Sequence, residues 1–348
     1  MKELIDKLAA EHQLERKEWR QLLKGWKEED ETLRYAARRA SNVRDQIYGK
    51  TVYIRGLIEF TNYCKNDCYY CGIRRGNGNA VRYRLTKKEI LECCSTGYES
   101  GFRTFVLQGG EDSYFTDKRI ADIVKSIKEN WPDCAVTLSI GEKTEESYRL
   151  FKEAGSDRYL LRHETANHSH YQRLHPPELS LEKRKDCLFS LKKLGYQTGA
   201  GFMVGSPGQT VETLIDDMEF LQELKPEMAG IGPFIPHCQT PFAKEPSGSV
   251  ELTLYLLSLI RLMLPSVLLP ATTALGTVSE GGREAGILAG ANVVMPNLSP
   301  EQVRGKYLLY DNKICTGKEA AEHLEDLKKS VSALGYTVVT DRGDYKKL

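Results

Sequence analysis

The sequence has no long apolar run and almost no net charge, and each absence excludes a class of protein. The best candidate for a membrane span, residues 252–264, is shorter than the roughly 20 residues that cross a bilayer and contains Arg261. Lys and Arg number 49 and Asp and Glu number 48, so the net charge is +1. Without a broad basic surface, nucleic-acid binding has no electrostatic support. We therefore expect no membrane and no nucleic acid as partner.

The N-terminal residues also lack the apolar core of a secretory signal, because Lys2, Glu3, Asp6 and Lys7 lie among them. We therefore expect a cytoplasmic protein. Thiols stay reduced in that compartment, so the nine cysteines do not predict a disulfide framework. Their spacing is then the informative feature. With 348 residues, the chain can bury a large core without such staples.

The pattern of apolar residues predicts three regions. Residues 1–50 are charged and helical in pattern, with a second helix over 31–49, and form an N-terminal helical extension. Short β-branched runs then alternate with amphipathic segments. The predicted strands are 51–60, 104–109, 135–140, 158–163, 197–205, 228–235, 268–274 and 292–296, and the predicted helices are 87–95, 117–130, 144–154, 180–194, 210–223, 252–264 and 282–289. This alternation predicts an α/β fold, a (β/α)8 TIM barrel over 51–300. Residues 301–348 are expected to close the barrel, with a last helix over 319–334.

Three cysteines directly follow the first predicted strand. Cys64, Cys68 and Cys71 have the spacing C-x3-C-x2-C, and Tyr70 precedes the third cysteine. In a barrel, this loop lies at the carboxyl end of the strands, where active sites are found. Three thiolates can hold three irons of a cubane and leave the fourth iron without a protein ligand. The spacing therefore predicts a 4Fe–4S cluster with one open iron.

Two other interpretations of these cysteines stay open. A structural zinc site usually has four protein ligands, but no second ligand pair follows nearby, and the nearest other cysteines are Cys93 and Cys94. The second alternative is that the three cysteines only pack in the core.

The cysteine motif resembles that of the radical S-adenosylmethionine (SAM) superfamily. The resemblance implies that SAM chelates the open iron and that reduction of the cluster cleaves SAM to methionine and a 5′-deoxyadenosyl radical. It also implies a GGE motif that binds the amino group of SAM. Gln108, Gly109, Gly110 and Glu111 match it at the end of the second strand, where glycines allow close approach of the backbone. The alternative is an ordinary turn from strand to loop.

Charged residues near the end of the fourth strand add to the predicted SAM pocket. By alternation, Arg162 and Glu164 point to one side and His163 to the other. One interpretation is a plain ion pair at the rim of the barrel. In the functional interpretation, Glu164 binds the ribose hydroxyls and Arg162 binds a carboxylate, joined by Arg184 from the next helix. His163 is more typical of a packing histidine.

Weaker candidates for the SAM pocket lie on other strands. Thr137 and Ser139 belong to the third strand, and Met203 belongs to the glycine-rich fifth strand, where a core methionine is the default interpretation. Ile231 lies on the sixth strand, which resembles the superfamily's adenine-binding strand.

Further polar residues predict a pocket for a substrate with a carboxylate. Arg55 lies in the first strand, Thr272 and Thr273 end the seventh, and Tyr307 and Tyr310 follow the eighth. A guanidinium binds carboxylate in a bidentate manner, and an unpaired charge inside a barrel is costly. The alternative for the tyrosines is packing on a helix face.

Longer strings resemble the HydE-type maturase family of FeFe-hydrogenase, namely residues 58–62, 159–167, 230–237, 270–276 and 290–297. The resemblance covers about residues 1–340. It implies radical chemistry on a cysteine-ligated iron carbonyl cyanide precursor of the hydrogenase cluster, with other hydrogenase maturases as partners. Some members carry a second cluster on a cysteine trio near the C-terminus, whereas only Cys315 stands in that region here.

Three rival interpretations remain. A methylornithine-synthase-like mutase acting on an amino acid uses the same barrel and is the main alternative. Biotin-synthase-like sulfur insertion needs cysteines on strand ends, which strands two to five lack. A non-catalytic metal-binding scaffold would keep the cysteines but would have no reason for the GGE and Arg-x-Glu patterns. An enzyme consumes SAM and a scaffold does not, so an assay of SAM consumption distinguishes these two interpretations. The identity of the product distinguishes a maturase from a mutase.

Overall fold

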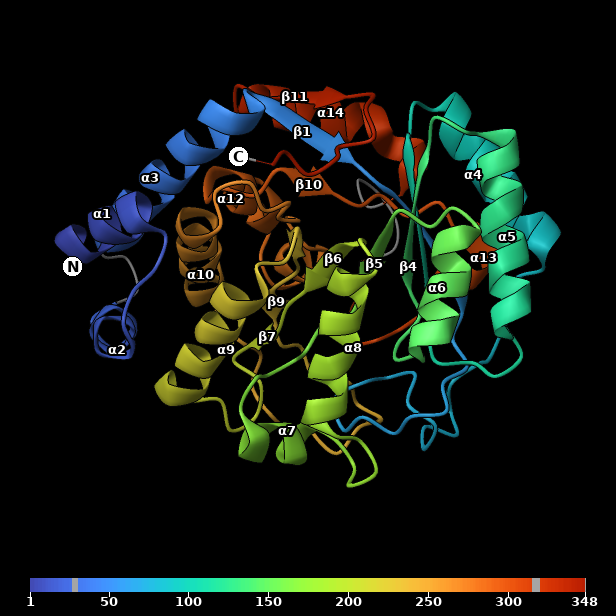
Figure 1. Cartoon of the computed structure of the whole chain (residues 1–348), viewed down its shortest axis with the longest axis horizontal. Coiled ribbons are helices and arrows are strands. Elements are labelled where there is room, and N and C mark those ends of the chain that lie inside the picture. The colour runs from blue at the N-terminus through green and yellow to red at the C-terminus, as the bar shows by residue number, and fades with distance from the viewer. Residues whose placement is uncertain (27–30, 315–319, 348) are drawn as a thin grey trace.

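The computed structural model describes residues 1–26, 31–314 and 320–347, with strands in the centre and helices around them (Figure 1). The strands are β1 (Thr51–Ile54), β2 (Gly56–Thr61), β3 (Thr104–Gly109), β4 (Ala135–Ser139), β5 (Arg158–Leu160), β6 (Gln197–Ala200), β7 (Met203–Val204), β8 (Met228–Ala229), β9 (Gly232–Pro233), β10 (Val293–Val294) and β11 (Thr337–Val339). The helices are α1 (Lys2–Glu11), α2 (Arg16–Lys24), α3 (Glu31–Tyr48), α4 (Lys87–Glu99), α5 (Asp117–Asn130), α6 (Glu145–Glu153), α7 (His168–Leu174), α8 (Leu181–Lys193), α9 (Val211–Leu224), α10 (Val250–Met263), α11 (Thr273–Val278), α12 (Gly282–Leu288), α13 (Glu301–Arg304) and α14 (Leu324–Ala333).

The strands close into a parallel barrel. The order β2-β3-β4-β5-β6-β8 forms most of the wall. Single bridges continue the wall from Met228 to Leu268 and from Pro270 to Val293 of β10, and β10 pairs with β1. The first strand position is split at Arg55 into β1 and β2, and the fifth and sixth positions are each split into two short strands. The predicted (β/α)8 barrel is therefore confirmed.

Serine and threonine caps fix where the outer helices begin. In α4, α5, α6, α8, α9 and α10, the capping side chain accepts a hydrogen bond from the backbone N–H of the third helical residue. The caps are Thr86, Thr116, Thr144, Ser180, Thr210 and Ser249. Each such bond satisfies an otherwise unpaired N–H and stabilises the helix by about 1 kcal/mol. The sequence carries this signal locally, so the predicted starts of these helices agree with the structure to within two residues.

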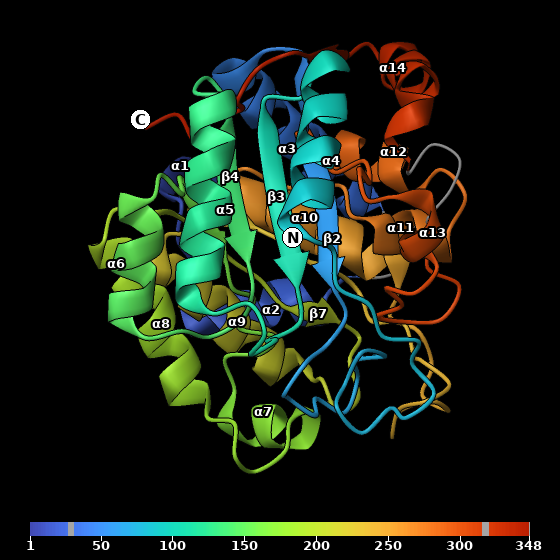
Figure 2. The same cartoon turned by 90° about the vertical axis from the view of Figure 1, so that its right-hand side faces the viewer.

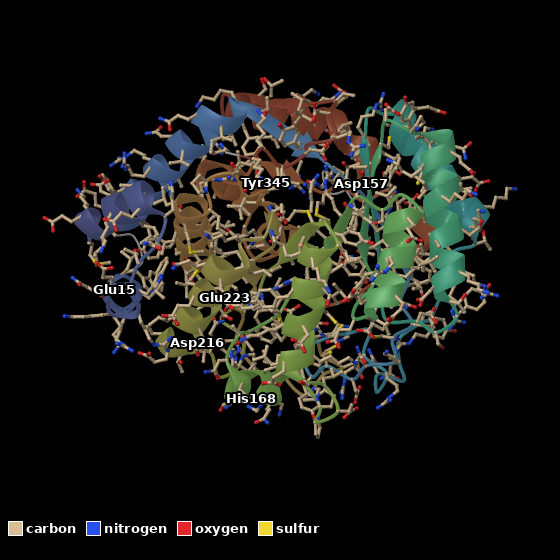
Figure 3. The ribbon with its side chains drawn as sticks, viewed as in Figure 1. Glu15, Asp157, His168, Asp216, Glu223 and Tyr345 are labelled. Atoms are coloured by element: carbon tan, nitrogen blue, oxygen red, sulfur yellow. The ribbon has the colours of Figure 1, made fainter. Side chains whose placement is uncertain are left out.

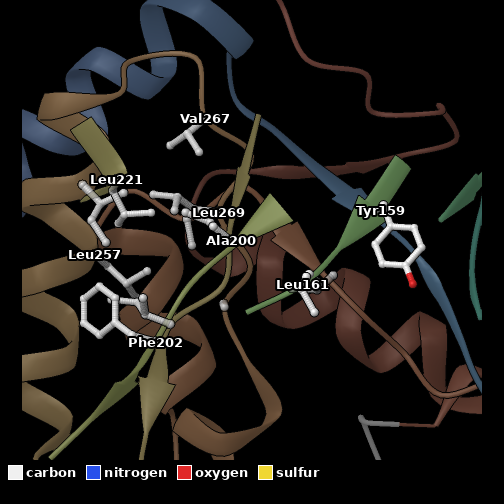
Figure 4. Packing of buried hydrophobic residues seen from close by; sticks show 14 of the residues in the cluster. Tyr159, Leu161, Ala200, Phe202, Leu221, Leu257, Val267 and Leu269 are labelled. Carbon is white, nitrogen blue, oxygen red and sulfur yellow. The ribbon is translucent and has the colours of Figure 1, made fainter. Parts of the chain in front are cut away.

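Apolar side chains fill the space between the barrel wall and the helices. Phe202, Leu221 of α9 and Leu257 of α10 are fully buried there and pack together (Figure 4). Burying a side chain of this size stabilises the fold by roughly 1.5–3 kcal/mol. None of the helices within the described residues is both long and apolar enough to cross a membrane.

The N-terminal helices pack on the outside of the barrel. α1 and α3 contact α10, and α2 contacts α9 (Figure 1). Arg20 of α2 donates two hydrogen bonds to the Glu212 carboxylate of α9, at 2.6 and 2.8 Å. The extension is thereby tied to helices that surround the fifth and sixth strand positions.

The C-terminal segment lies at the end of the barrel where the strands begin. β11 pairs in parallel with β1, and Arg342 contacts Asp157 just before β5 at 2.9 Å. Figure 3 labels Asp157 and Tyr345 at this end of the molecule and His168 at the other. Figure 2 shows β2, β3 and β4 pointing away from the C-terminus, toward the loop that follows β2. The cysteine loop and the C-terminal segment therefore occupy opposite ends.

Several predicted elements are wrong in part. The predicted strands 158–163 and 292–296 are shorter in the structure, where β5 ends at Leu160 and β10 covers only Val293–Val294. In the predicted strand 268–274, only bridges at Leu268 and Pro270 form, and α11 begins at Thr273. The reason is local, because Ala274 and Leu275 favour a helix and Leu275 packs against α12. The predicted last helix is shorter, since α14 begins at residue 324 after a 3-10 turn over 321–323. Its predicted first residue, 319, and Cys315 lie outside the described residues. The helices α7, α11 and α13 and the strand β11 were not predicted.

Buried neutral histidines give the fold a predictable pH dependence. His163 packs against Phe202 and Phe220, and burial lowers its pKa from 6.5 to about 3. His170 bonds to Thr165 at 3.0 Å, and burial lowers its pKa to about 4. The unfolded chain therefore binds more protons below pH 6.5, so stability is full above that pH and falls as the pH drops toward 4.

We expect the free energy of unfolding to fall by about 1.4 kcal/mol per pH unit below pH 6 through His170. The loss through His163 is offset by Asp217, which lies 3.4 Å from its Nε2 and whose pKa is raised by burial, so that the folded protein takes up a proton there as the pH falls. Urea unfolding midpoints measured from pH 7.5 to pH 5 test this. A flat profile over that window would contradict it.

Candidate metal centre and cofactor pocket

A cavity of about 300 Å³ opens at the carboxyl end of the barrel. It brings together residues that are far apart in the sequence. On the side predicted to hold the cluster and SAM, the lining includes Cys64, Cys68, Tyr70, Cys71, Gln108, Gly109, Gly110, Glu111, Ser139, Arg162, Glu164, Arg184 and Met203. On the side predicted to hold the substrate, it includes Thr272, Tyr307 and Tyr310. Arg55, Thr137, Ile231 and Thr273 do not line it.

The three cysteines lie on the loop between β2 and α4. A turn joins Cys68 to Cys71, whose N–H donates to the Cys68 carbonyl at 3.2 Å. Gly72 donates to the Leu309 carbonyl at 2.8 Å, and a Cβ at Gly72 would lie 2.2 Å from the Leu308 carbonyl oxygen, so only glycine fits. Burial raises the pKa of Cys64, of Cys68 (to about 12) and of Cys71. These three cysteines are therefore neutral thiols on their own and become thiolates only when a cation binds to them.

The spread of the thiols favours a cluster over a single ion. Ligands of a single metal ion lie close together. Among the described residues, His237, Cys238 and Asp311 form the one group of three His, Cys, Asp or Glu residues whose ligand atoms all lie within 4.8 Å of one another, and the three cysteines of the motif do not form such a group. The thiols of the motif are thus more widely spread than the ligands of one zinc ion. A cubane offers each thiol its own iron. The three-cysteine donor set therefore fits a 4Fe–4S cluster.

The GGE segment packs directly on the cysteine loop. A Cβ at Gly110 would lie 2.2 Å from the Tyr63 carbonyl oxygen, so this position also requires glycine. The Glu111 carbonyl accepts a hydrogen bond from the Lys65 N–H at 2.9 Å. The Glu111 carboxylate accepts another from the Glu142 N–H at 3.0 Å and pairs with the Lys65 ammonium at 3.1 Å. These contacts fix the end of β3 beside Cys64.

The charged residues after β5 form one connected group. Arg162 and Glu164 pair at 3.2 Å, but the pair lacks hydrogen-bond alignment, so Nε and Nη2 of Arg162 and Oε2 of Glu164 have no hydrogen-bond partner in the described structure. Glu164 has a left-handed backbone (φ 66°), which is strained for a residue with a side chain. Such unpaired buried groups facing a cavity indicate a polar ligand. Both sequence interpretations of this pair are compatible with that geometry.

Arg184 is held by a residue that sequence reasoning missed. Its Nε donates to the Glu142 carboxylate at 2.6 Å, and its Nη1 donates to the Arg162 carbonyl at 2.9 Å. Both side chains are more than nine-tenths buried. Glu142 lies in an irregular loop after β4, where no motif marks it. Its role is to position Arg184 and, through its N–H, Glu111.

Replacing Glu142 with glutamine should weaken SAM binding. The amide keeps the shape but removes the charge opposite Arg184, and breaking a buried charge pair is costly. We expect the apparent KM for SAM to rise by about tenfold, which corresponds to roughly 1.4 kcal/mol, with a smaller change in kcat. Glu145→Gln, on α6, is the matched control, because this half-buried carboxylate pairs with Arg149 and does not line the cavity. An unchanged KM in Glu142→Gln would contradict the positioning role.

The predicted substrate residues divide between the cavity and the barrel below it. Thr272 lines the cavity with a buried hydroxyl that has no hydrogen-bond partner among the described residues. Tyr307 is buried, and its hydroxyl lies 3.5 Å from Nε2 of Gln108. Burial raises the pKa of Tyr310 well above its usual value. The tyrosines therefore stay neutral hydrogen-bonding groups.

Arg55 lies deeper, inside the barrel. Its Nη1 lies 3.0 Å from the sulfur of Met228 on β8, while Nε and Nη2 have no hydrogen-bond partner in the described part of the chain. Two strand positions separate β8 from β1 in the wall, so this contact crosses the barrel interior. Burial and then the nearby Arg158 charge lower the pKa of Arg55 well below its usual value. A negatively charged ligand would relieve this cost.

The remaining candidates lie in packed surroundings. Thr137 is buried on β4, and its hydroxyl has no hydrogen-bond partner within residues 1–26, 31–314 and 320–347. Ile231 is fully buried between β8 and β9. Thr273 begins α11, and Met203 lines the cavity beside Phe234. Their predicted contacts with SAM or substrate stay predictions.

Comparisons with known proteins agree with this geometry. Residues 58–221 match the model of the radical SAM superfamily. The chain is 48% identical over 309 residues to the FeFe hydrogenase maturase subunit HydE of Thermotoga maritima, covering 89% of this chain and 88% of that protein. It is 29% identical to the 3-methylornithine synthase of Methanosarcina barkeri, over 95% and 91% of the two chains. The crystal structure of methylornithine synthase (PylB) superposes with a TM-score of 0.85 at 27% identity, covering 97% of both chains.

The barrel, the cysteine loop and these matches define a radical SAM enzyme. Within that superfamily, the chain belongs to the family of the maturase subunit HydE. As a member, it uses a 4Fe–4S cluster and SAM, and its cysteine motif is Cys64, Cys68 and Cys71. The interpretations as a structural zinc site and as a non-catalytic scaffold are thereby wrong.

Proposed function

We propose that the protein is a maturase for the active-site cluster of FeFe-hydrogenase, acting on a cysteine-ligated iron carbonyl cyanide complex. The observation that carries the proposal is 48% identity with HydE across nearly the whole of both chains. We also propose that it works with other hydrogenase maturases. The bound cluster and SAM supply a 5′-deoxyadenosyl radical on one-electron reduction.

The chain's own residues are suited to hold the reactants. We propose that Gly109, Gly110 and Glu111 bind the methionyl part of SAM, because this segment packs against the cysteine loop. Glu164 and Arg162 line the same cavity with polar atoms that have no hydrogen-bond partner in the part of the chain that the structure describes, which supports their contact with the ribose and carboxylate of SAM. The remaining predicted SAM contacts are Tyr70, Gln108, Thr137, Ser139, Arg184, Met203 and Ile231.

We place a small anionic substrate, as a proposal, on the other side of the cavity. We propose that Thr272, Tyr307 and Tyr310 donate hydrogen bonds to it, with Thr273 at the edge. Arg55 supplies the positive charge below. No carboxylate among the described residues forms an ion pair with it, so its burial favours an anion. The barrel wall surrounds this space, and limiting the access of water would protect a radical from side reactions.

The test is anaerobic SAM cleavage by the reduced holoprotein, measured as 5′-deoxyadenosine with and without the iron complex. Strong stimulation and a new paramagnetic iron species are expected. In Arg55→Met, the apparent KM for the complex should rise by at least about tenfold, or roughly 1.4 kcal/mol. Arg55→Lys should retain part of the affinity, because it keeps a cation. Cleavage that the complex does not stimulate would contradict the proposed substrate.

A methylornithine-synthase-like mutase is the second candidate, favoured by the close superposition with that fold. It predicts that lysine, and not the iron complex, stimulates SAM cleavage. Formation of a rearranged amino acid would establish this alternative.

A further inference from the structure

A second group of metal-ligand side chains lies where two loops meet beside the cavity. His237 and Cys238 follow β9, and Asp311 follows α13. One ligand atom of each residue lies within 4.8 Å of the other two. The Asp311 N–H donates to the Pro236 carbonyl at 3.0 Å, and the Cys238 N–H donates to Oδ2 of Asp311 at 2.8 Å. These two hydrogen bonds therefore hold the two loops next to each other before any ion binds.

The three side chains are already oriented toward one another. His237 is buried, and its ring lies against Gly72, where a Cβ would approach to 2.3 Å of the ring. Its Nε2 faces Oδ1 of Asp311 at 3.9 Å, a separation suited to two ligands of one ion. The Cys238 N–H engages the other carboxylate oxygen, so Oδ1 stays available. Cys238 is exposed, which leaves water access to the site.

We propose that His237, Cys238 and Asp311 bind a divalent transition-metal ion, for which Zn²⁺ is the best match. Imidazole, thiolate and carboxylate are the ligands that zinc takes, and water completes a four-coordinate shell. Binding releases the Cys238 thiol proton to solvent. When Nε2 of His237 binds the ion, its proton moves to Nδ1. Nδ1 then no longer accepts the hydrogen bond from the Gln239 N–H, now 3.0 Å long, and the new metal bond at Nε2 takes its place.

Such an ion would brace one wall of the cavity. Leu309 and Tyr310 line the cavity and directly precede Asp311, and the Leu309 carbonyl accepts the Gly72 N–H beside Cys71. An ion on Asp311 and His237 ties this wall to the cysteine loop. This metal site is separate from the cluster cysteines and does not depend on the proposed substrate.

The test uses cluster-loaded protein under anaerobic conditions. Zinc is titrated against a competing chelator, and zinc and iron are counted per chain after gel filtration. The unaltered protein should retain one zinc with its iron content unchanged. Cys238→Ala and Asp311→Asn should each bind zinc at least about tenfold more weakly. Asp326→Asn, an exposed aspartate on α14, is the matched control and should bind like the unaltered protein.

The ligand set gives a second readout. X-ray absorption at the zinc edge should detect one sulfur ligand in the unaltered protein and none in Cys238→Ala. Three outcomes would overturn the proposal: no zinc retained, equal affinity in Cys238→Ala, or zinc gained only as iron is lost.

Discussion

Replacing Cys68 with alanine is expected to abolish reductive SAM cleavage while the barrel stays folded. Cys68 lies on a loop and not in a strand, and its thiol is one of three that hold the cluster. With two thiols left, the cubane loses the protein ligand of one iron. We expect 5′-deoxyadenosine to fall below detection and the free energy of unfolding to change by no more than about 1 kcal/mol. Iron content, product analysis and urea unfolding measure these outcomes.

Cys93→Ala is the matched control for this experiment. Cys93 is buried on α4, outside the residues that line the cavity, so its loss removes a thiol without touching the cluster loop. This variant should keep its iron and its SAM cleavage. If Cys68→Ala formed 5′-deoxyadenosine at the rate of the control, the assignment of the cluster ligands would be wrong.

The cluster loop could be predicted because the residues that define it are close together in the sequence. Cys64, Cys68 and Cys71 lie within eight residues of one another, directly after a run that reads as a strand. The barrel prediction needs only the alternation of strands and helices, and the helix starts are marked by their own capping residues. Each of these signals is local, so no knowledge of tertiary contacts is required.

Long-range pairing was not predictable in the same way. Glu142 carries no motif, and its role depends on meeting Arg184, which is 42 residues away in the chain. The strand β11 has three residues, too few to show alternation, and exists because β1 offers it a free edge. Arg55 was predicted for the cavity, but the split between β1 and β2 places it deeper, against Met228.

Replacing Arg158 with methionine is expected to be strongly destabilising. Arg158 begins β5, and its side chain is fully buried at the end of the barrel opposite the cluster loop. Its guanidinium donates hydrogen bonds to Thr104 Oγ1 (2.9 Å), Gln197 Oε1 (3.1 Å), Arg342 O (2.8 Å), Gly343 O (3.2 Å) and Asp344 Oδ1 (2.6 Å). Methionine matches the length of the side chain but removes all five of these donated bonds. Arg342 O, Gln197 Oε1 and Asp344 Oδ1 then each keep one other donor, from Thr104, the Tyr345 N–H and Gln197 Nε2. Breaking a buried charged network of this kind costs about 3–5 kcal/mol.

The Asp344 carboxylate should matter less than Arg158. Although burial raises its pKa, the hydrogen bond from Arg342 and the charge of Arg158 together lower the pKa well below its usual value. The side chain is 40% exposed, however, so solvent screens part of this interaction. We expect Asp344→Asn to cost about 1 kcal/mol, because the two carbonyl acceptors of Arg158 remain.

Urea unfolding of three variants checks these expected losses in the free energy of unfolding, which should be largest in Arg158→Met, smaller in Asp344→Asn and smallest in Arg149→Met. Arg149 forms an exposed pair with Glu145 at 2.9 Å, worth about 0.3–0.5 kcal/mol, and serves as the matched surface control. Because Arg158 joins β5 to the C-terminal segment, limited proteolysis should also cut residues 340–347 faster in Arg158→Met. A loss as small as that of Arg149→Met, with unchanged proteolysis, would show that the Arg158 guanidinium contributes little and that the other contacts of the segment, β11 and the pair of Arg342 with Asp157 among them, hold it in place.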